Sequence, residues 1–206
     1  MTLSNTIKKI AHYYSSKVIE YGCNPKGVDW NDAPSQITRF VQLLKIIDGN
    51  NKFTINDIGC GYGALYEFMK NKYQFFEYYG LDISKVMIEN ASNNYKSENV
   101  SFSVSNIPES IANYSVASGI FNVKLNVKNH DWLNYIKYTI DIMNQKSNKG
   151  FAFNCLTSYS DRDKMRNDLY YADPLFLFDY CKKKYSKNVA ILHDYDLYEF
   201  TVLIRK

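Results

Sequence analysis

Apolar positions recur with two different periods along the chain, which predicts a protein built from both helices and strands. They return every three or four residues over 4–21 and again over 35–44, as on one face of a helix. Residues 53–58 instead form a short β-prone run, followed by a glycine-rich turn and a helix-compatible segment. This alternation continues, with strands expected at 78–84, 99–104, 114–120 and 150–156 and helices at 64–70, 84–96, 130–145 and 174–184.

The end of the chain departs from this alternation. Its last two strand candidates, residues 189–193 and 197–204, are separated by only residues 194–196. So short a connection rules out a parallel crossover, and the two strands must pair as an antiparallel hairpin.

The first part of the chain lies outside the alternating core, because it precedes the first strand. Its two helices are separated by a segment that Pro25, Gly27 and Pro34 punctuate, and Ser35 is the expected cap of the second helix. We therefore expect one α/β domain spanning 1–206, with a helical section at 1–48 and an αβ core at 53–206.

The composition sets few further limits. With 206 residues, 46% of them hydrophobic, the chain is long enough for one α/β domain with a full core. Its formal net charge of +4 does not indicate a nucleic-acid binder, although it would not repel an anionic substrate. No apolar run approaches the length of a membrane span, and lysines interrupt the N-terminal helix, so we expect neither a membrane anchor nor a signal peptide.

The cysteines indicate an intracellular setting. Cys23, Cys60, Cys155 and Cys181 are scattered, without a C-x-x-C pair or the spacing of a zinc site. This pattern favours reduced thiols and a cytoplasmic protein.

The most informative stretch is the turn that follows the first strand. Asp57 precedes Gly59, Gly61 and Gly63, which occupy alternate positions. Glycines suit such a turn because it needs positive φ angles and because a missing Cβ lets a ligand lie against the backbone. Strand, glycine turn and helix in this order form the opening half of a nucleotide-binding unit.

Two nucleotide classes are compatible with this turn. The glycines also fit the dinucleotide fingerprint, which alone is weak evidence. However, the acidic-x-Gly-x-Gly-x-Gly pattern resembles that of class I S-adenosylmethionine (SAM) methyltransferases. The next strand candidate carries Asp82 near its end, as in that family, where a carboxylate can accept hydrogen bonds from both ribose hydroxyls. A dinucleotide dehydrogenase would normally continue into a second domain.

The resemblance implies a Rossmann-like α/β fold with a seven-stranded, mostly parallel sheet. In that family the strand order is 3-2-1-4-5-7-6, the last two strands form an antiparallel hairpin, and N-terminal helices cover the cofactor as a lid. The implied cofactor is SAM, with S-adenosylhomocysteine (SAH) as its product.

The resemblance also implies which residues contact SAM. The glycine turn, including Cys60, should meet the methionyl part, with Asp57 near its ammonium group. Asp82 should hold the ribose, while Ile83 should flank the adenine. The further expected contacts are Gly59, Gly61, Gly63, Asn106, Ile107, Phe121, Tyr14, Trp30 and Arg39.

Several of these residues have a second interpretation. Arg39 is either a bidentate partner of the SAM carboxylate or a surface arginine. Trp30 either forms a wall of the pocket or fastens the loop in which it lies. Asn106 either meets the adenine amino group or is a solvated loop amide. Tyr13 and Tyr14 point about 100° apart on a helix, so only one of them can face the core and the other could contact a ligand.

Methyl transfer from a sulfonium is a direct displacement, so the protein mainly has to align the reacting groups. His193 is the best candidate base by residue type, since it lies at a strand end beside Asp194, and His130 is the alternative. Asn122 ends the fourth strand, where cofactor and substrate should meet. Tyr171 lies in the loop after the fifth strand and is a candidate substrate contact. No serine or cysteine nucleophile has a paired base, which leaves hydrolases without support.

Metal-dependent relatives need carboxylates after the fourth and fifth strands. The fifth strand here ends in Asn154-Cys155-Leu156, so we expect no metal, with Asp131 as the remaining candidate ligand. The fourth strand also lacks the Asn/Asp-Pro-Pro-aromatic turn of enzymes that methylate amino groups of nucleic acids.

A looser resemblance concerns the substrate. The segments 27–31, 118–124 and 171–174 look like those of small bacterial methyltransferases from surface-polysaccharide gene clusters. The resemblance implies O-methylation of a small polar or phosphorylated acceptor, such as a sugar or a phosphoramidate-type intermediate of capsule biosynthesis. The alternatives are an RNA or protein methyltransferase, which would need an added binding module, and a SAM-binding partner subunit without catalysis.

Overall fold

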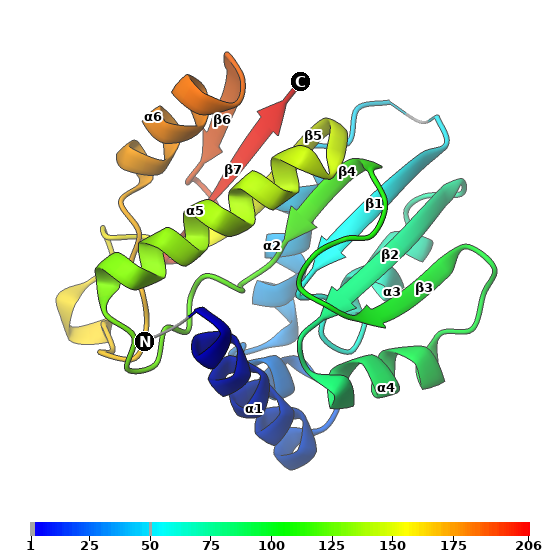
Figure 1. The fold of residues 1–206 in the computed structure, drawn as a ribbon, viewed down its shortest axis with the longest axis horizontal. Helices are drawn as coiled ribbons and strands as arrows, with labels where there is room; N and C mark the ends of the chain where they lie inside the picture. Colours follow the sequence, from blue (N-terminus) through cyan, green and yellow to red (C-terminus); the bar gives the residue numbers. More distant parts are fainter. Residues whose placement is uncertain (1–2, 50) are drawn as a thin grey trace.

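Seven strands form one sheet, in the order β3-β2-β1-β4-β5-β7-β6, in the computed structural model, which describes residues 3–49 and 51–206 (Figure 1). Strands β1 to β5 pair in parallel, and β7 runs antiparallel to both β5 and β6. This confirms the expected strand order and the C-terminal hairpin. The strands are β1 (Phe53–Ile58), β2 (Phe76–Asp82), β3 (Val100–Val104), β4 (Ala112–Ala117), β5 (Ser147–Leu156), β6 (Asn188–Leu192) and β7 (Glu199–Arg205).

The helices also follow the predicted pattern, with two short 3-10 turns that it did not contain. These turns are η1 (Pro25–Val28) and η2 (Arg162–Lys164), both in loops rich in polar residues. No helix of the described chain has the length and apolarity needed to span a bilayer. The α-helices are α1 (Leu3–Tyr21), α2 (Ala33–Leu44), α3 (Ala64–Lys70), α4 (Lys85–Asn94), α5 (Asn129–Gln145) and α6 (Pro174–Lys184).

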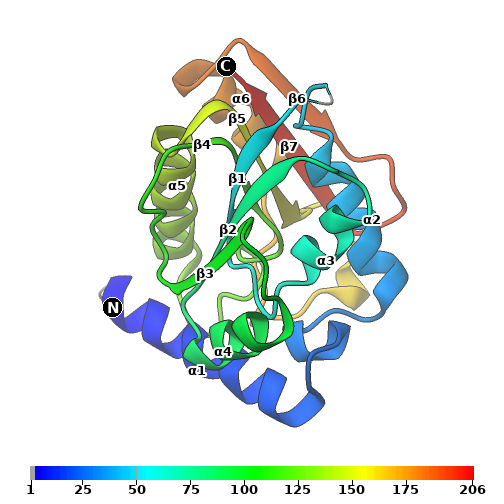
Figure 2. The same cartoon turned by 90° about the vertical axis from the view of Figure 1, so that its right-hand side faces the viewer.

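The alternation of side chains along each strand divides the core into two layers. In β5, Phe151 and Phe153 pack on the side of α5 and α6, whereas Ala152 faces the opposite side with α2 and α3. Figure 2 shows α5 on one side of the sheet and α2 and α3 on the other. Both faces of the parallel strands are therefore covered, and residues on both sides of β1 and β4 are buried.

Helix α1 lies across the edge where the parallel strands end (Figures 1 and 2). Its Ile10 and Val18 side chains are buried, and the Ser15 hydroxyl lies 2.7 Å from that of Ser84, at the start of α4. Although the N-terminal section precedes the alternating core in sequence, it thus packs directly on the carboxyl ends of the strands.

Two local predictions need correction. Strand β4 ends at Ala117 rather than at residue 120, so the fourth strand reaches the sheet edge earlier than its apolar pattern suggested. Helix α2 is capped by Asp32, whose side chain accepts a hydrogen bond from the Ser35 backbone N–H at 2.8 Å; Ser35 itself lies inside the helix.

Candidate functional site

A cavity with about 860 Å³ of space free of protein atoms, part of it open to solvent, lies at the carboxyl ends of β1 and β4. The strand order reverses at this point, since β1 has β2 on one side and β4 on the other. Ligands of open α/β sheets bind at such reversals. We call it the first cavity; its lining residues are Ile10, Tyr14, Val28, Trp30, Gln36, Phe40, Asp57, Ile58, Gly59, Cys60, Gly61, Tyr62, Ala64, Leu65, Asp82, Ile83, Met87, Ser105, Asn106, Ser118, Gly119, Ile120 and Tyr135.

The glycine turn forms one wall of the first cavity. Gly59, Gly61 and Gly63 have φ angles of 79°, 55° and 88°, which L residues rarely adopt. The backbone N–H groups of Gly59 and Cys60 both donate to the Leu81 carbonyl, at 2.7 and 2.9 Å. The turn is therefore held against the end of β2, and its φ angles are positive, as predicted for these glycines.

Asp57 presents an unsatisfied oxygen at this wall. Its side chain is buried, and its Oδ2 accepts a hydrogen bond from the Tyr78 hydroxyl. Its Oδ1 has no hydrogen-bond partner among the described residues. Burial raises the pKa of Asp57 to about 7, an effect that the Tyr78 hydrogen bond partly offsets. A buried carboxylate oxygen without a partner suits a cationic donor on a ligand.

Asp82 lies next to Asp57 at the end of β2. Its Oδ2 accepts from the Gly61 N–H at 2.9 Å and its Oδ1 from the Ser84 N–H at 2.8 Å. Burial raises the pKa of Asp82 to about 6, against the lowering effect of these backbone donors. Each carboxylate oxygen keeps a further lone pair for a ligand hydroxyl.

The structure brings most of the expected cofactor contacts to the first cavity. Besides the aspartates, Gly59 and Gly61, its lining includes Tyr14, Trp30, Cys60, Ile83 and Asn106. The orientation of the tyrosine pair is resolved, since Tyr14 faces the cavity and the Tyr13 hydroxyl donates to Asp29 at 2.9 Å.

Four expected contacts do not line the first cavity. Gly63 lies at the start of α3, and the exposed Ile107 lies in the loop after β3. Phe121 is fully buried, with its ring against Phe153, because the early end of β4 puts Ile120 at the cavity instead. The fourth residue, Arg39, lines a second cavity.

The second cavity adjoins the first at Trp30 and has about 1000 Å³ of space free of protein atoms, part of it open to solvent. The two cavities share Tyr14, Val28, Trp30 and Gly119. A Cβ on Gly119 would lie 2.3 Å from Cζ2 of Trp30, so the indole lies directly over this backbone. The other lining residues are Asp29, Asn31, Arg39, Asn122, Val123, Leu156, Ser160, Lys164, Arg166, Leu169, Tyr171, Tyr198 and Glu199.

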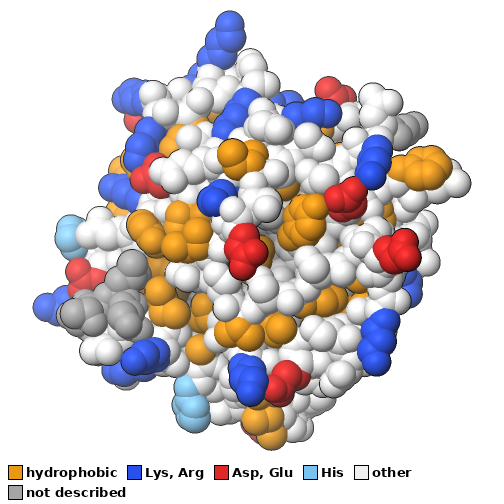
Figure 3. All heavy atoms as spheres, turned by 45° about the vertical axis from the view of Figure 1, so that its right-hand side comes forward, with side chains coloured by type: hydrophobic (Ala, Val, Ile, Leu, Met, Phe, Trp, Pro, Cys, Tyr) orange, Lys and Arg blue, Asp and Glu red, His pale blue; other side chains and the backbone are white. Residues whose placement is uncertain are grey.

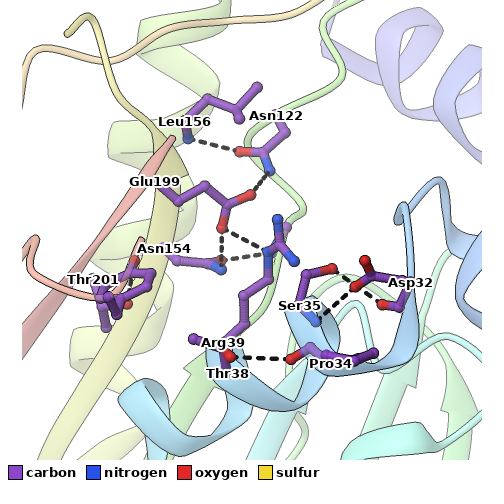
Figure 4. A network of polar contacts seen from close by, with 12 residues as sticks. Asp32, Pro34, Ser35, Thr38, Arg39, Asn122, Asn154, Leu156, Glu199 and Thr201 are labelled. Atoms are coloured by element: carbon purple, nitrogen blue, oxygen red, sulfur yellow. Dashed lines mark hydrogen bonds and ion pairs between the residues drawn. The ribbon is translucent and has the colours of Figure 1, made fainter. Parts of the chain in front are cut away.

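A buried polar network forms the base of the second cavity (Figure 4). Glu199, at the start of β7, accepts from Arg39 Nε at 2.8 Å, from Asn154 Nδ2 at 2.9 Å and from Asn122 Nδ2 at 3.1 Å. The Asn122 Oδ1 accepts from the Leu156 N–H at 3.0 Å. The network joins α2, the loop after β4, β5 and β7. It shows that Arg39 is not a surface arginine and that its ion-pair partner is Glu199.

The expected catalytic residues have three different placements. Asn122 lies in the buried network, and both its amide atoms are hydrogen-bonded. Tyr171 lines the second cavity, and its hydroxyl accepts from the Arg166 N–H at 2.9 Å. His193 follows β6 and lines neither cavity; its ring lies 5.9 Å from that of Phe200 and 6.2 Å from that of Tyr159. The alternative base, His130, is 83% exposed at the start of α5.

Sequence reasoning did not include several lining residues. Ser118 and Gly119 follow β4 directly, but the apolar pattern predicts them to lie within the strand, because it places the strand end at residue 120. Gln36 lies one helical turn before Arg39, a spacing that could have identified it. Tyr135 and Glu199 come from α5 and β7, and no local signal marks them. Within 3–49 and 51–206, no three His, Cys, Asp or Glu side chains are grouped as metal ligands would be.

Comparisons with known proteins agree with this geometry. Residues 55–142 match the sequence model of a methyltransferase domain family. The chain is 49% identical over 164 residues to the Mycobacterium tuberculosis protein named "Putative methyltransferase Rv1506c", covering 79% of this chain and 99% of that protein. Magnesium protoporphyrin IX methyltransferase from Synechocystis PCC 6803 is structurally similar both with bound SAM (TM-score 0.68) and with bound SAH (TM-score 0.70). Each alignment covers 98% of this chain, with 97% and 100% of the respective neighbour and 13% identity, which shows a shared fold.

Proposed function

The chain belongs to the class I SAM-dependent methyltransferases, and we propose that it methylates an oxygen of a small polar metabolite in the cytoplasm. A sugar or a phosphoramidate-type intermediate of capsular polysaccharide biosynthesis is the acceptor we favour. The observation that carries this proposal is the second cavity, which adjoins the first at Trp30 and Gly119 and has charged and hydroxyl-bearing walls.

We assign the first cavity to SAM, and its residues fit that molecule. The unpartnered Asp57 Oδ1 suits the SAM ammonium, and the free lone pairs of Asp82 suit the ribose hydroxyls. A Cβ on Gly61 would lie 3.2 Å from Val28 Cγ1, so Val28 packs closely on the glycine turn at this wall. The N-terminal section, described from residue 3, contributes Tyr14, Val28 and Trp30 to the wall, which supports its proposed role as a lid.

SAM supplies an activated methyl group, whose carbon–sulfur bond breaks as the new oxygen–carbon bond forms, leaving a neutral thioether. The protein's part is to exclude water and to hold the acceptor oxygen in line. A hydroxyl acceptor must lose its proton to a base, whereas an ionised phosphate-type oxygen has none to lose. Among the described residues no histidine lines the second cavity, and its two carboxylates, Asp29 and Glu199, are held in ion pairs with Lys17 and Arg39. This favours an acceptor oxygen that is already ionised.

The two alternative functions, methylation of RNA or protein and a partner subunit without catalysis, fit less well. On the face shown in Figure 3, Lys and Arg side chains are interspersed with Asp and Glu, without the continuous basic surface that RNA binding favours. The second cavity is open, whereas a partner subunit without catalysis would have it blocked.

The test is a transfer assay with purified protein, SAM and separate acceptor panels. The panels are sugar phosphates, nucleotide sugars, phosphoramidates, neutral sugars, bulk RNA and protein. We expect SAH release together with one added methyl group, found by mass spectrometry, on a phosphorylated or phosphoramidate acceptor. Transfer to RNA or protein alone would overturn the proposal.

A further inference from the structure

We infer that Arg39 holds a phosphate-type anionic group of the acceptor in the second cavity, rather than the carboxylate of SAM. This rests on the proposed function, since it assumes that the second cavity receives the acceptor. It assigns Arg39 as a specificity-determining residue.

The first argument is an unused donor. Arg39 is only 8% exposed, and its Nε is committed to Glu199. Its Nη1 is buried and has no partner among the described residues. A buried charged donor that is left unsatisfied costs free energy, so this nitrogen favours a ligand that brings an oxygen to it.

The second argument is that the guanidinium is held in place before any ligand arrives. Its Cζ lies 3.8 Å from the centre of the Trp30 ring, which fixes its plane, and Glu199 fixes its edge. Glu199 is itself held by Asn122 and Asn154, as Figure 4 shows. A donor positioned in this way loses little side-chain entropy on binding, which is what selective recognition of an anion requires.

The third argument is the placement of α2 between the cavities. Gln36 lines the first cavity, and Arg39, one turn later, lines the second. The Trp30 indole, which lines both, stacks on the guanidinium. Arg39 thus contributes to the acceptor side, and Gln36 is the polar residue of this helix that faces SAM.

The charge of the cavity wall is consistent with an anion. The wall contains three cations, Arg39, Lys164 and Arg166, and two acids, Asp29 and Glu199. Asp29 is paired with Lys17 at 3.1 Å and Arg166 with Asp168 at 2.6 Å, and both of these partners lie outside this wall. The charges that remain are those of Arg39 and Lys164 against that of Glu199, which already accepts three hydrogen bonds. A tetrahedral phosphate can accept from donors on several sides at once, which suits cations from α2 and from the loop around η2 better than a planar carboxylate does.

The experiment titrates inorganic phosphate into the SAH-loaded protein and follows tryptophan fluorescence. Of the two tryptophans, Trp30 contacts Arg39 and Trp132 is fully buried, so the signal reports on the proposed site. Arg39→Lys keeps the charge and can still pair with Glu199, but it removes the second nitrogen donor. The matched control is Arg205→Lys, because Arg205 donates to the Lys45 carbonyl and lines neither cavity.

We expect Arg39→Lys to weaken phosphate binding about tenfold or more, with SAH affinity unchanged and with Arg205→Lys like the unmodified protein. If Arg39→Lys fails to fold by circular dichroism, the double variant Arg39→Gln/Glu199→Gln takes its place, since it leaves no unpaired carboxylate. Unchanged phosphate affinity in a folded variant overturns the inference, as does a loss of SAH affinity with phosphate binding intact. Equal competition by acetate overturns the phosphate assignment.

These outcomes are distinct from a failure of the proposed function. Phosphate binding needs no turnover, so Arg39-dependent binding in a protein that methylates only RNA would overturn the proposed function and leave the anion site in place. Conversely, if transfer to a phosphorylated acceptor did not depend on Arg39, the inference about Arg39 would be overturned and the proposed function would stand.

Discussion

The Tyr78 hydroxyl donates a hydrogen bond to Asp57 Oδ2, and both side chains are buried beneath the glycine turn. This one donor limits how far burial raises the pKa of Asp57, which is about 7 in the unliganded protein.

The first prediction concerns pH. Asp57 must be ionised to pair with the SAM ammonium, so SAH affinity should rise as the pH increases through about 7. Tyr78→Phe removes the stabilising donor, raises the pKa of Asp57 further and shifts this rise to higher pH. Calorimetry with SAH over a pH series measures both effects. A pH-independent affinity would show that Asp57 does not meet the ammonium.

The second prediction is that Asp57→Asn stabilises the unliganded protein while weakening SAH binding. The folded-state pKa of Asp57 lies above its unfolded value of 3.8, so its contribution to the free energy of unfolding is full at acid pH and is lost as the pH rises to about 7. The amide removes this loss. It should raise the Tm at pH 8 and weaken SAH binding by about ten- to a hundredfold, as expected for a charge-assisted hydrogen bond. If Asp57→Asn had a lower Tm than the unmodified protein at pH 8 and a higher Tm at pH 4, the predicted direction of the pH dependence would be wrong.

The third prediction compares the two adenosine contacts. Asp82→Ala should weaken SAH binding much more than Asn106→Ala, because hydrogen bonds to a carboxylate contribute roughly 1.5–3 kcal/mol each and a neutral one about 1. Calorimetry on both variants decides this. Equal losses would indicate that the ribose or the adenine lies elsewhere in the first cavity.

The fourth prediction uses two glycines with nearly the same backbone. Gly49 and Gly119 have φ angles of 76° and 74°, but a Cβ on Gly49 would meet no described atom within 4 Å beyond its chain neighbours. Gly49→Ala should therefore cost only the backbone strain, about 1–2 kcal/mol in urea unfolding. Gly119→Ala should cost more, and it should also change Trp30 fluorescence and transfer rate. Equal stability of the two variants would mean that the indole moves away without resistance.

The fifth prediction tests the buried network. Glu199→Ala leaves the Arg39 charge unpaired and should lower the free energy of unfolding by about 3–5 kcal/mol. Glu77→Ala is the control, because Glu77 pairs with Lys52 at the surface, and such pairs contribute about 0–1 kcal/mol. Urea unfolding of both variants measures the difference, and a loss below 1 kcal/mol for Glu199→Ala would contradict the ion pair.

The sequence predicts well what short-range patterns encode. Asp57 and the glycines specify the turn because strand, turn and helix are contiguous, and the short gap before the last strand, residues 193–198 in the structure, enforces the hairpin. The apolar pattern predicts too late an end for β4, because Ile120 and Phe121 continue the apolar run although Gly119 has already turned the chain with a φ of 74°.

Contacts between residues far apart in the sequence cannot be predicted from such short-range patterns. Arg39 and Glu199 are 160 positions apart, and only the folded sheet brings β7 beside α2. His193 illustrates the opposite case, since a chemically attractive residue at a strand end proved to lie away from both cavities. Residue type identifies candidate site residues, but the three-dimensional arrangement of the loops determines which of them line the same cavity.

The contact between α2 and β7 ties acceptor binding to the last strand of the sheet. Arg39 lies on α2, and its counterion, Glu199, begins β7 and also lines the second cavity. A truncation before β7 would therefore remove both the counterion of Arg39 and part of the wall of the second cavity. The last strand thus bears on the choice of substrate as well as on the fold.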